Sequence, residues 1–411
     1  MTKGSPVTQP PATTHGQGRI SSLDGLRGTA AAAVVINHAV LTIPVFAALD
    51  YNIPVQHTWF EWAFTYTPLH LFWAGNESVM VFFVLSGLVL TLPIMAHRSH
   101  FDWRAYYPQR LVRLYVPLAA SVALALVWAT TVVRRTDPAL SYWVNLHHQE
   151  LTPWRVLLDV FVVTGASKLN SPLWSLQYEV LFSLLLPLYI LIATRLRAHP
   201  WVLAGIALAA STIGRATHIG ILQYLPVFAL GVLLAVHWNE VSDIAQRIQS
   251  SASSRLIWTV ITIATSAAFT CTWAIVGLPA ALHAVDFAFP IVIASAVVIV
   301  FISAQTGTAR RLLTTPAITW LGKVSFSLYL VHEPIIVSAA LLARPDWEWL
   351  AALLSIPVAV TVGWTFNLLI ERPSHSLARR VARAISASDR LSAGTEIARH
   401  QYEATRRGSK P

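Results

Sequence analysis

Ten apolar stretches, each close to the length that crosses a lipid bilayer, decide what this chain of 411 residues can fold into. An α-helix needs about 20 consecutive apolar residues to span the hydrocarbon core. The stretches lie at about 29–49, 77–96, 111–133, 173–193, 200–214, 219–237, 256–276, 285–304, 322–343 and 348–370. The sequence therefore predicts an all-α, polytopic bundle of about ten transmembrane helices in the cell membrane.

The composition agrees with that prediction and excludes other classes of protein. Hydrophobic residues make up 55% of the chain and charged residues only 12%, whereas a soluble domain carries about 25% charged residues. The formal net charge of +10 is interpreted as a topology signal, and no binding of nucleic acid is predicted. Cys271 is the single cysteine, which excludes a disulfide framework and a thiolate metal site.

The distribution of Lys and Arg orients the predicted spans. Ten spans put both termini on one side, and only six of the 29 Lys and Arg residues then fall on the other side. These six are Arg134, Arg135, Arg155, Lys168, Arg215 and Arg344. Because cytoplasmic loops are enriched in positive charge, both termini are predicted to be cytoplasmic. The short apolar piece Trp154–Ala166 is predicted to be an interfacial or re-entrant helix, because counting it as a span would spoil this bias.

The chain is predicted to consist of one membrane domain and two tails. Residues 1–20 are polar and rich in Thr, Pro and Gly, which predicts a flexible cytoplasmic N-terminal tail. Residues 21–373 form the membrane domain. Residues 374–411 form a basic cytoplasmic C-terminal tail, whose arginines are expected near anionic lipid headgroups.

The stretch Ser22–His38 carries the first candidate site residues. It opens with a charged turn, Asp24–Gly28, and continues as an apolar run that contains His38. Arg27 and His38 are eleven residues apart, and eleven steps of roughly 100° return to within about 20° of the same face of a helix. The sequence thus predicts an arginine at one membrane surface and an imidazole about 16 Å deeper on the same stripe. A merely structural histidine is the alternative, but an ionisable group at that depth is costly and usually functional.

Two further spans place ionisable side chains at a similar depth. Glu179 lies six residues into the fourth span, about 9 Å from its predicted outer end. His332, followed by Glu333, lies nine residues past Lys323 on a span that runs outward. Ionisable groups on three spans together predict a polar chamber inside the bundle.

A pair of arginines marks the cytoplasmic start of the third span. Arg110 and Arg113 are three residues apart and share one helix face. Arg27 and Glu371 are predicted at the same surface, and a cluster of guanidinium groups there can hold phosphates by bidentate hydrogen bonds. Glu371 is expected to brace one of these arginines. Simple anchoring of the span by positive charge is the alternative interpretation.

No metal ion and no tightly bound cofactor are predicted. Histidines in the outer loops lack the spacing of metal ligands on a helix. These are His57, His70, His147 and His148. The chain also lacks a glycine-rich nucleotide loop, so any phosphate would be held by side chains.

These motifs, taken in order, resemble the membrane-bound acyltransferase 3 family, which O-acylates sugars, glycans and macrolides. The resemblance covers about residues 21–373. It rests on Arg27 and His38 with ten residues between them, F-F-V-L-S-G at Phe82–Gly87, Arg110 with Arg113, L-W-S-L-x-x-E ending at Glu179, S-F-S-L-Y-L-V-H ending at His332, and Glu371-Arg372-Pro373. Asp24 and Ser86 lie within these motifs and are predicted to bind or support substrate. The family often has a second glutamate where this chain has Val180.

The resemblance implies an acyl-coenzyme A (acyl-CoA) donor and a hydroxylated acceptor. We expect the donor phosphates on Arg27, Arg110 and Arg113, and His38 as general base on the acceptor hydroxyl. Glu179 is expected to orient either His38 or the acceptor. His332 contacts either the acceptor or the developing oxyanion, and a covalent acyl-histidine relay stays open.

Two other functions are alternatives to acyl transfer. A proton-coupled small-molecule transporter would use the buried histidines and Glu179 as a proton relay. A structural scaffold would leave those groups unexplained. The sequence shows no internal repeat of the kind that marks many transporters, which favours transfer chemistry. Release of CoA discriminates between the two, because a transporter releases none.

Overall fold

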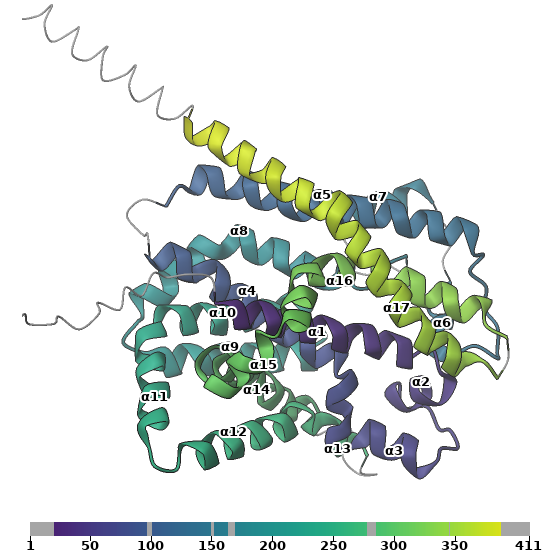
Figure 1. The fold of residues 1–411 in the computed structure, drawn as a ribbon, viewed down its shortest axis with the longest axis horizontal. Coiled ribbons are helices and arrows are strands. Elements are labelled where there is room, and N and C mark those ends of the chain that lie inside the picture. The colour runs from purple at the N-terminus through teal and green to yellow at the C-terminus, as the bar shows by residue number, and fades with distance from the viewer. Residues whose placement is uncertain are drawn as a thin grey trace, which may run out of the picture.

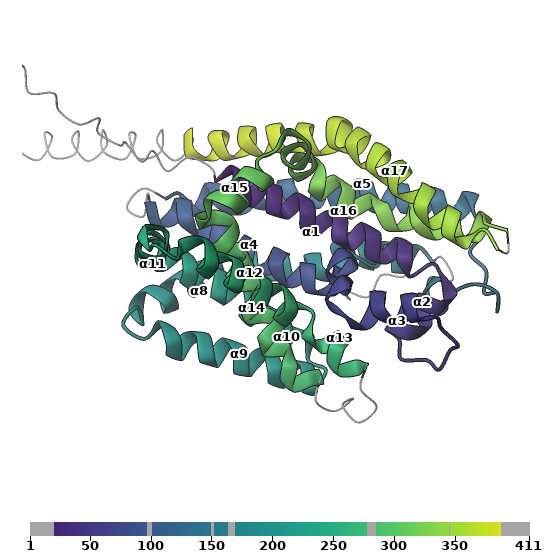
Figure 2. The same cartoon turned by 60° about the horizontal axis from the view of Figure 1, so that its bottom comes forward.

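The computed structural model describes residues 20–96, 101–148, 152–162, 169–277, 285–344 and 346–387. Within these ranges the regular elements are all helices (Figures 1 and 2). The predicted all-α bundle is therefore confirmed. Residues 1–19 and 388–411, which make up most of the two predicted tails, lie outside the described ranges.

Within the described ranges, six helices are long and apolar enough to cross a membrane. They are α4 (Gly75–Ala96), α5 (Trp103–Thr131), α8 (Leu173–Arg195), α14 (Val285–Gln305), α16 (Pro316–Leu342) and α17 (Glu348–Phe366), which continues as helix to Ala387. Two bent pairs raise the number to eight, namely α1 (Ser21–Val40) with α2 (Pro44–Asp50) and α10 (Gly220–Val236) with α11 (Trp238–Ser250). The apolar helices α9 (Pro200–Ala216) and α12 (Ser254–Phe269) are shorter.

Each of the ten predicted stretches thus contains an apolar helix, but six to eight helices qualify as spans in the described part of the chain. The first stretch shows why. The helix begins at Ser21, so the predicted charged turn Asp24–Gly28 is itself helical. It ends at Val40, and α2 starts at Pro44 with a bend of 112°. Proline restricts the residue before it to extended conformations, which ends a helix.

The remaining elements are short. They are α3 (Trp59–Tyr66), the 3-10 helix η1 (Pro68–Trp73), α6 (Tyr142–Asn145), α7 (Pro153–Phe161), α13 (Cys271–Val276), α15 (Gly307–Leu313) and the π-helical turn η4 (Asn367–Glu371). Helix α7 covers most of the segment predicted to be interfacial. Its nine residues are too few to span a bilayer, and it leaves Trp154 and Phe161 exposed.

Glycines allow the closest helix contacts of the bundle. A Cβ atom on Gly28 of α1 would lie 2.5 Å from the backbone nitrogen of Gly322 on α16, and one on Gly231 of α10 would lie 2.1 Å from the Val84 carbonyl oxygen on α4. Small residues let membrane helices approach closely enough for van der Waals packing to hold them together. Helix α1 consequently crosses the middle of the bundle beside α16 (Figures 1 and 2).

The C-terminal helix extends beyond the predicted end of the membrane domain at residue 373. It runs to Ala387, along one face of the bundle (Figure 1). Near its end, the Ser386 hydroxyl donates to Asp102, 2.6 Å away, and the other oxygen of Asp102 caps the start of α5. The first residues of the predicted C-terminal tail are therefore an ordered part of the bundle.

Candidate active site

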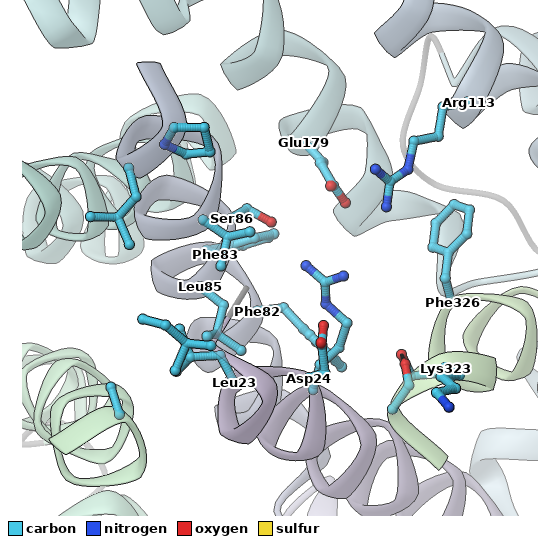
Figure 3. Close-up of a pocket in the computed structure, with 18 of the residues that line it drawn as sticks. Leu23, Asp24, Phe82, Phe83, Leu85, Ser86, Arg113, Glu179, Lys323 and Phe326 are labelled. Carbon is cyan, nitrogen blue, oxygen red and sulfur yellow. Dashed lines mark hydrogen bonds between the residues drawn. The ribbon is translucent and has the colours of Figure 1, made fainter. Parts of the chain in front are cut away.

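A cavity of about 1210 Å³ lies between α1, α4, α5, α8, α16 and η4, with further lining residues from α11, α14 and α15. Of the nine residues predicted for the site, seven line it. They are Asp24, Arg27, Ser86, Arg110, Arg113, Glu179 and Glu371. Figure 3 shows the Glu179 carboxylate and the Arg113 guanidinium directed into one space, with Asp24 on the facing helix. The structure thus gathers these seven residues from five separate elements around one chamber.

Positive charge dominates the lining. Seven Lys or Arg residues face the cavity, against three Asp or Glu. Arg113 is close enough to Arg27 and Arg110 for their charges to repel its own, and Glu179 and Glu371 offset part of that repulsion. Such a cluster is suited to an anion with several charges, which relieves the repulsion on binding.

Arg110 is held in a specific orientation by α8. Its Nη2 donates to Glu179 Oε1 at 2.6 Å, and its Nε donates to the Ser183 hydroxyl at 3.1 Å. That hydroxyl in turn donates to the Glu179 carbonyl oxygen. Glu179 therefore braces a predicted donor-binding arginine, in place of the predicted contact with His38 or the acceptor.

The depth predicted for Glu179 was wrong, and the start of α8 gives the reason. Leu169, Asn170 and Leu173 are all at most 2% exposed, and Asn170 Nδ2 donates to the Leu330 carbonyl oxygen in the middle of α16 at 2.7 Å. Helix α8 thus starts inside the bundle and not at its outer surface. Six residues further along, Glu179 reaches the arginine cluster.

Glu371 is fixed by polar groups at the π-helical turn. The Ser327 hydroxyl and Asn367 Nδ2 donate to its Oε2 at 2.5 and 2.7 Å, and Arg372 Nε donates to the Asn367 side-chain oxygen. The wider π turn places Asn367 and Glu371 side by side, and such turns are frequent at functional sites. Glu371 contributes to the charge balance of Arg113, in line with its predicted bracing role.

His38 and His332 lie beyond the cavity, as a pair. His38 Nδ1 is 2.9 Å from His332 Nε2, and the two rings are stacked with centroids 5.0 Å apart. Tyr329 connects them to the cavity: it lines the chamber, and its ring centroid is 5.9 Å from that of His332. The prediction that Arg27 and His38 share one helix holds, because α1 is continuous from Ser21 to Val40.

The hydrogen bonds determine which ring nitrogen of His38 is a base. His332 Nδ1 is 3.0 Å from the Leu328 carbonyl oxygen, which can only accept, so this nitrogen carries the hydrogen. In the neutral ring His332 Nε2 is then an acceptor, and His38 Nδ1 must donate to it. His38 Nε2 is left with a free lone pair, ready to take a proton.

Three side chains of this region were not predicted for the site. Trp143 and His147 come from α6 and the residues after it, and the Trp143 ring lies 5.1 Å from that of His38. Only long-range folding brings them there, so no local pattern could indicate them. Tyr329 could have been predicted from the sequence, since it is three residues before His332 and shares its helix face. No group of three His, Cys, Asp or Glu in the described ranges is placed to hold a metal ion.

A family model described as an acyltransferase domain matches residues 20–368. The chain belongs to the acyltransferase 3 family. Among curated proteins it is similar to Nodulation protein 10 of Rhizobium leguminosarum bv. viciae, with 25% identity over 403 residues that cover 92% of this chain and all of that protein. It is also similar to Acyltransferase MdmB of Streptomyces mycarofaciens, with 24% identity over 90% of this chain and 95% of that one. No solved structure matches.

Family membership and the apolar helices make this acyltransferase a multi-pass membrane protein. The family match covers α1 to α17, so the histidine pair and the elements that line the cavity up to Leu368 lie within the matched residues.

The ion pair of Arg110 with Glu179 is predicted to stabilise the site. The two side chains are 10% and 23% exposed, so removing one partner leaves a charge in a poorly solvated place. In a double-mutant cycle with Arg110→Ala and Glu179→Ala, we expect a coupling of about 1–3 kcal/mol in the free energy of unfolding. Denaturant unfolding in mixed micelles measures it.

The pair of Arg197 with Glu240 is the matched control. Its two atoms are equally close, but the side chains are 53% and 51% exposed. The same cycle there should give a coupling below about 1 kcal/mol. Equal couplings for the two pairs would show that burial adds nothing at Arg110.

Proposed function

We propose that this acyltransferase, seated in the cell membrane, moves an acetyl or another short acyl group from acyl-CoA to a hydroxyl of a carbohydrate, glycan or glycosylated metabolite. One observation carries the proposal: a basic cavity leads, through Tyr329, to a histidine whose Nε2 has a free lone pair. The cavity suits the donor, and the histidine suits the activation of a hydroxyl.

The charge and the size of the cavity support a CoA donor. CoA carries three phosphate groups, and Arg27, Arg110 and Arg113 supply guanidinium groups that hold phosphates well. Ligand pockets usually measure about 300–1000 Å³, so a chamber of about 1210 Å³ has room for an elongated donor. The pantetheine arm would extend past Phe82 and Ser86 toward Tyr329, which lie on α4 and α16.

The reaction follows from the proton positions. His38 Nε2 takes the proton of the acceptor hydroxyl as its oxygen attacks the thioester carbon. The new C–O bond forms, the C–S bond breaks, and the proton on His38 goes to the leaving thiolate, so that CoA departs as a thiol. His332 keeps His38 in the reactive tautomer, which makes it a positioning residue in place of the predicted contact with acceptor or oxyanion.

The side of the membrane on which each substrate binds follows from the topology. With both termini in the cytoplasm, as the distribution of Lys and Arg predicts, Arg27 lies at the cytoplasmic end of α1. Acyl-CoA then enters from the cytoplasm. The acceptor enters from the outside or from the lipid interface, because the histidine pair lies about 16 Å further along α1.

A proton-coupled transporter is the alternative function. It would use the same buried histidines as a proton relay. The family match to an acyltransferase domain weighs against it. Purified protein that consumes acetyl-CoA and releases free thiol supports transfer chemistry, whereas a transporter leaves acetyl-CoA intact.

Substitution of His38 tests the proposed base. His38→Ala should lower thiol release from acetyl-CoA by about 100-fold or more, the usual contribution of general base catalysis. The assay uses purified protein, acetyl-CoA and a panel of methyl glycosides as acceptors. His199→Ala, which changes an exposed histidine at the start of α9, should retain wild-type activity. A well-folded His38→Ala protein with full activity would disprove the assignment.

Substitution of Arg113 tests the donor site. Arg113→Ala should raise the KM for acetyl-CoA about tenfold, because one charge-assisted contact to phosphate is worth roughly 1.5–3 kcal/mol. The KM for the acceptor should stay unchanged. Arg255→Ala, which removes an exposed arginine outside the cavity lining, is the control. An effect confined to the acceptor KM would place the donor elsewhere.

A further inference from the structure

A second buried cluster lies next to the histidine pair, and its residues are not part of the cavity lining. Glu333 follows His332 on α16 and is fully buried. Its Oε1 is 2.5 Å from His147 Nε2, and its Oε2 accepts a hydrogen bond of 2.8 Å from the Ser171 hydroxyl. The proposed mechanism uses neither Glu333 nor His147. A buried carboxylate is expensive unless it is paired, so the cluster calls for an explanation.

The hydrogen bonds place the protons in this cluster. His147 Nδ1 is 2.8 Å from the Trp143 carbonyl oxygen, which can only accept, so Nδ1 carries a hydrogen. Ser171 donates to the other oxygen of Glu333, which fits a carboxylate. One proton lies between His147 Nε2 and Glu333 Oε1, and Glu333 is a carboxylate when His147 Nε2 carries that proton.

A proline in α16 explains how Ser171 comes to lie beside Glu333. Pro334 has no N–H, so the Leu330 carbonyl lacks its usual helical donor. Asn170 Nδ2 fills that place at 2.7 Å. The adjacent residue, Ser171, is thus set beside Glu333. Arg134 connects the segment at His147 with the segment at Leu169, because its guanidinium donates to the carbonyl oxygens of Leu169 and His147 at 3.0 and 3.4 Å.

The cluster contacts His38 through an aromatic ring and through charge. The Trp143 ring lies 4.4 Å from the His147 ring and 5.1 Å from the His38 ring. The negative charge of Glu333 attracts a positive charge on His38, whereas His147 and His332 repel it. Among these three side chains, only Glu333 attracts a positive charge on His38.

We infer that Glu333 and His147 are positioning residues for acyl transfer: the Glu333 carboxylate stabilises the protonated His38–His332 pair, and His147 holds that carboxylate and Trp143 in place. This inference rests on the proposed role of His38 as base. It gives His38 a nearby negative charge from Glu333, which does not line the cavity. It also makes the segment Ser141–His147 part of the catalytic apparatus, anchored by the Ser141 hydroxyl, which donates to the Leu41 carbonyl oxygen at 2.7 Å.

The test compares two substitutions of Glu333 in the purified full-length protein. Glu333→Gln keeps the size and a hydrogen-bond acceptor for Ser171 but removes the charge, and Glu333→Asp keeps the charge. With acetyl-CoA and the methyl glycosides, Glu333→Gln should lower kcat about 10- to 100-fold, as expected for one lost charge interaction at a buried site. The KM for acetyl-CoA should change by less than about twofold, because the donor site is untouched. Glu333→Asp should restore part of kcat.

Glu77→Gln is the matched control. Glu77 is also a carboxylate in a membrane helix, 6% exposed, and it accepts its hydrogen bond from Trp273 and not from the histidine pair or His147. It should leave kcat near the wild-type value. His147→Asn should reproduce the kcat loss of Glu333→Gln, since it releases the carboxylate and the Trp143 ring.

The outcomes separate this inference from the proposed function. Wild-type kcat in Glu333→Gln overturns the inference and leaves the role of His38 intact. Equal kcat losses in Glu333→Gln and Glu333→Asp, with a raised KM for acetyl-CoA in both, also overturn it, because that pattern indicates a purely structural role. Absence of thiol release by the wild-type protein refutes the proposed function itself.

Discussion

The packing of α1 against α16 is the contact on which the rest of the site depends. Gly28 and Gly322 let the two backbones approach so closely that a Cβ on either would collide with the other helix. The same approach brings His38 of α1 within hydrogen-bonding distance of His332 on α16. One helix pair therefore carries both functions: Arg27 and Lys323 face the cavity, and the two histidines lie beyond it.

The packing of α1 against α16 also keeps the arginine cluster apart from the buried Glu333. The guanidinium groups gather at one end of α1, where Glu179 and Glu371 offset their repulsion. The buried anion Glu333 lies at the other end, paired with His147. A base must be neutral before it takes a proton and must then hold a positive charge. Burial away from water favours the neutral form of His38, whereas distance from the arginines and a fixed carboxylate nearby both favour the charged form.

Much of the cavity could be predicted from the sequence because its residues follow local rules. Arg27 and His38 share a face by helix periodicity, and Arg110 and Arg113 share another. The bends and depths could not be predicted in the same way. Helix α8 starts inside the bundle because Asn170 docks on the Leu330 carbonyl that Pro334 leaves without a donor. That contact joins residues 160 positions apart, and it moved Glu179 from the level of His38 to the arginine cluster.

The pair of His147 with Glu333 could not be predicted from the sequence for the same physical reason. His147 looked like one of several scattered loop histidines, and Glu333 was noted only as the neighbour of His332. Their ion pair depends on how the loop after α5 folds back over α16, which Arg134 and Ser171 determine. Periodicity describes single helices, whereas this pair depends on the tertiary fold of the loop.

In the proposed function, one bundle accepts a donor from the cytoplasm and passes its acyl group to a hydroxyl that arrives from the other side or from the lipid interface on that side. Sealed inside-out vesicles, which expose the cytoplasmic face, test it directly. Radiolabelled acetyl-CoA is added outside, and methyl glycosides are enclosed in the lumen. The account predicts labelled glycoside in the lumen and free thiol outside. Label found only on glycosides supplied on the same face as acetyl-CoA, or label on none, would contradict it.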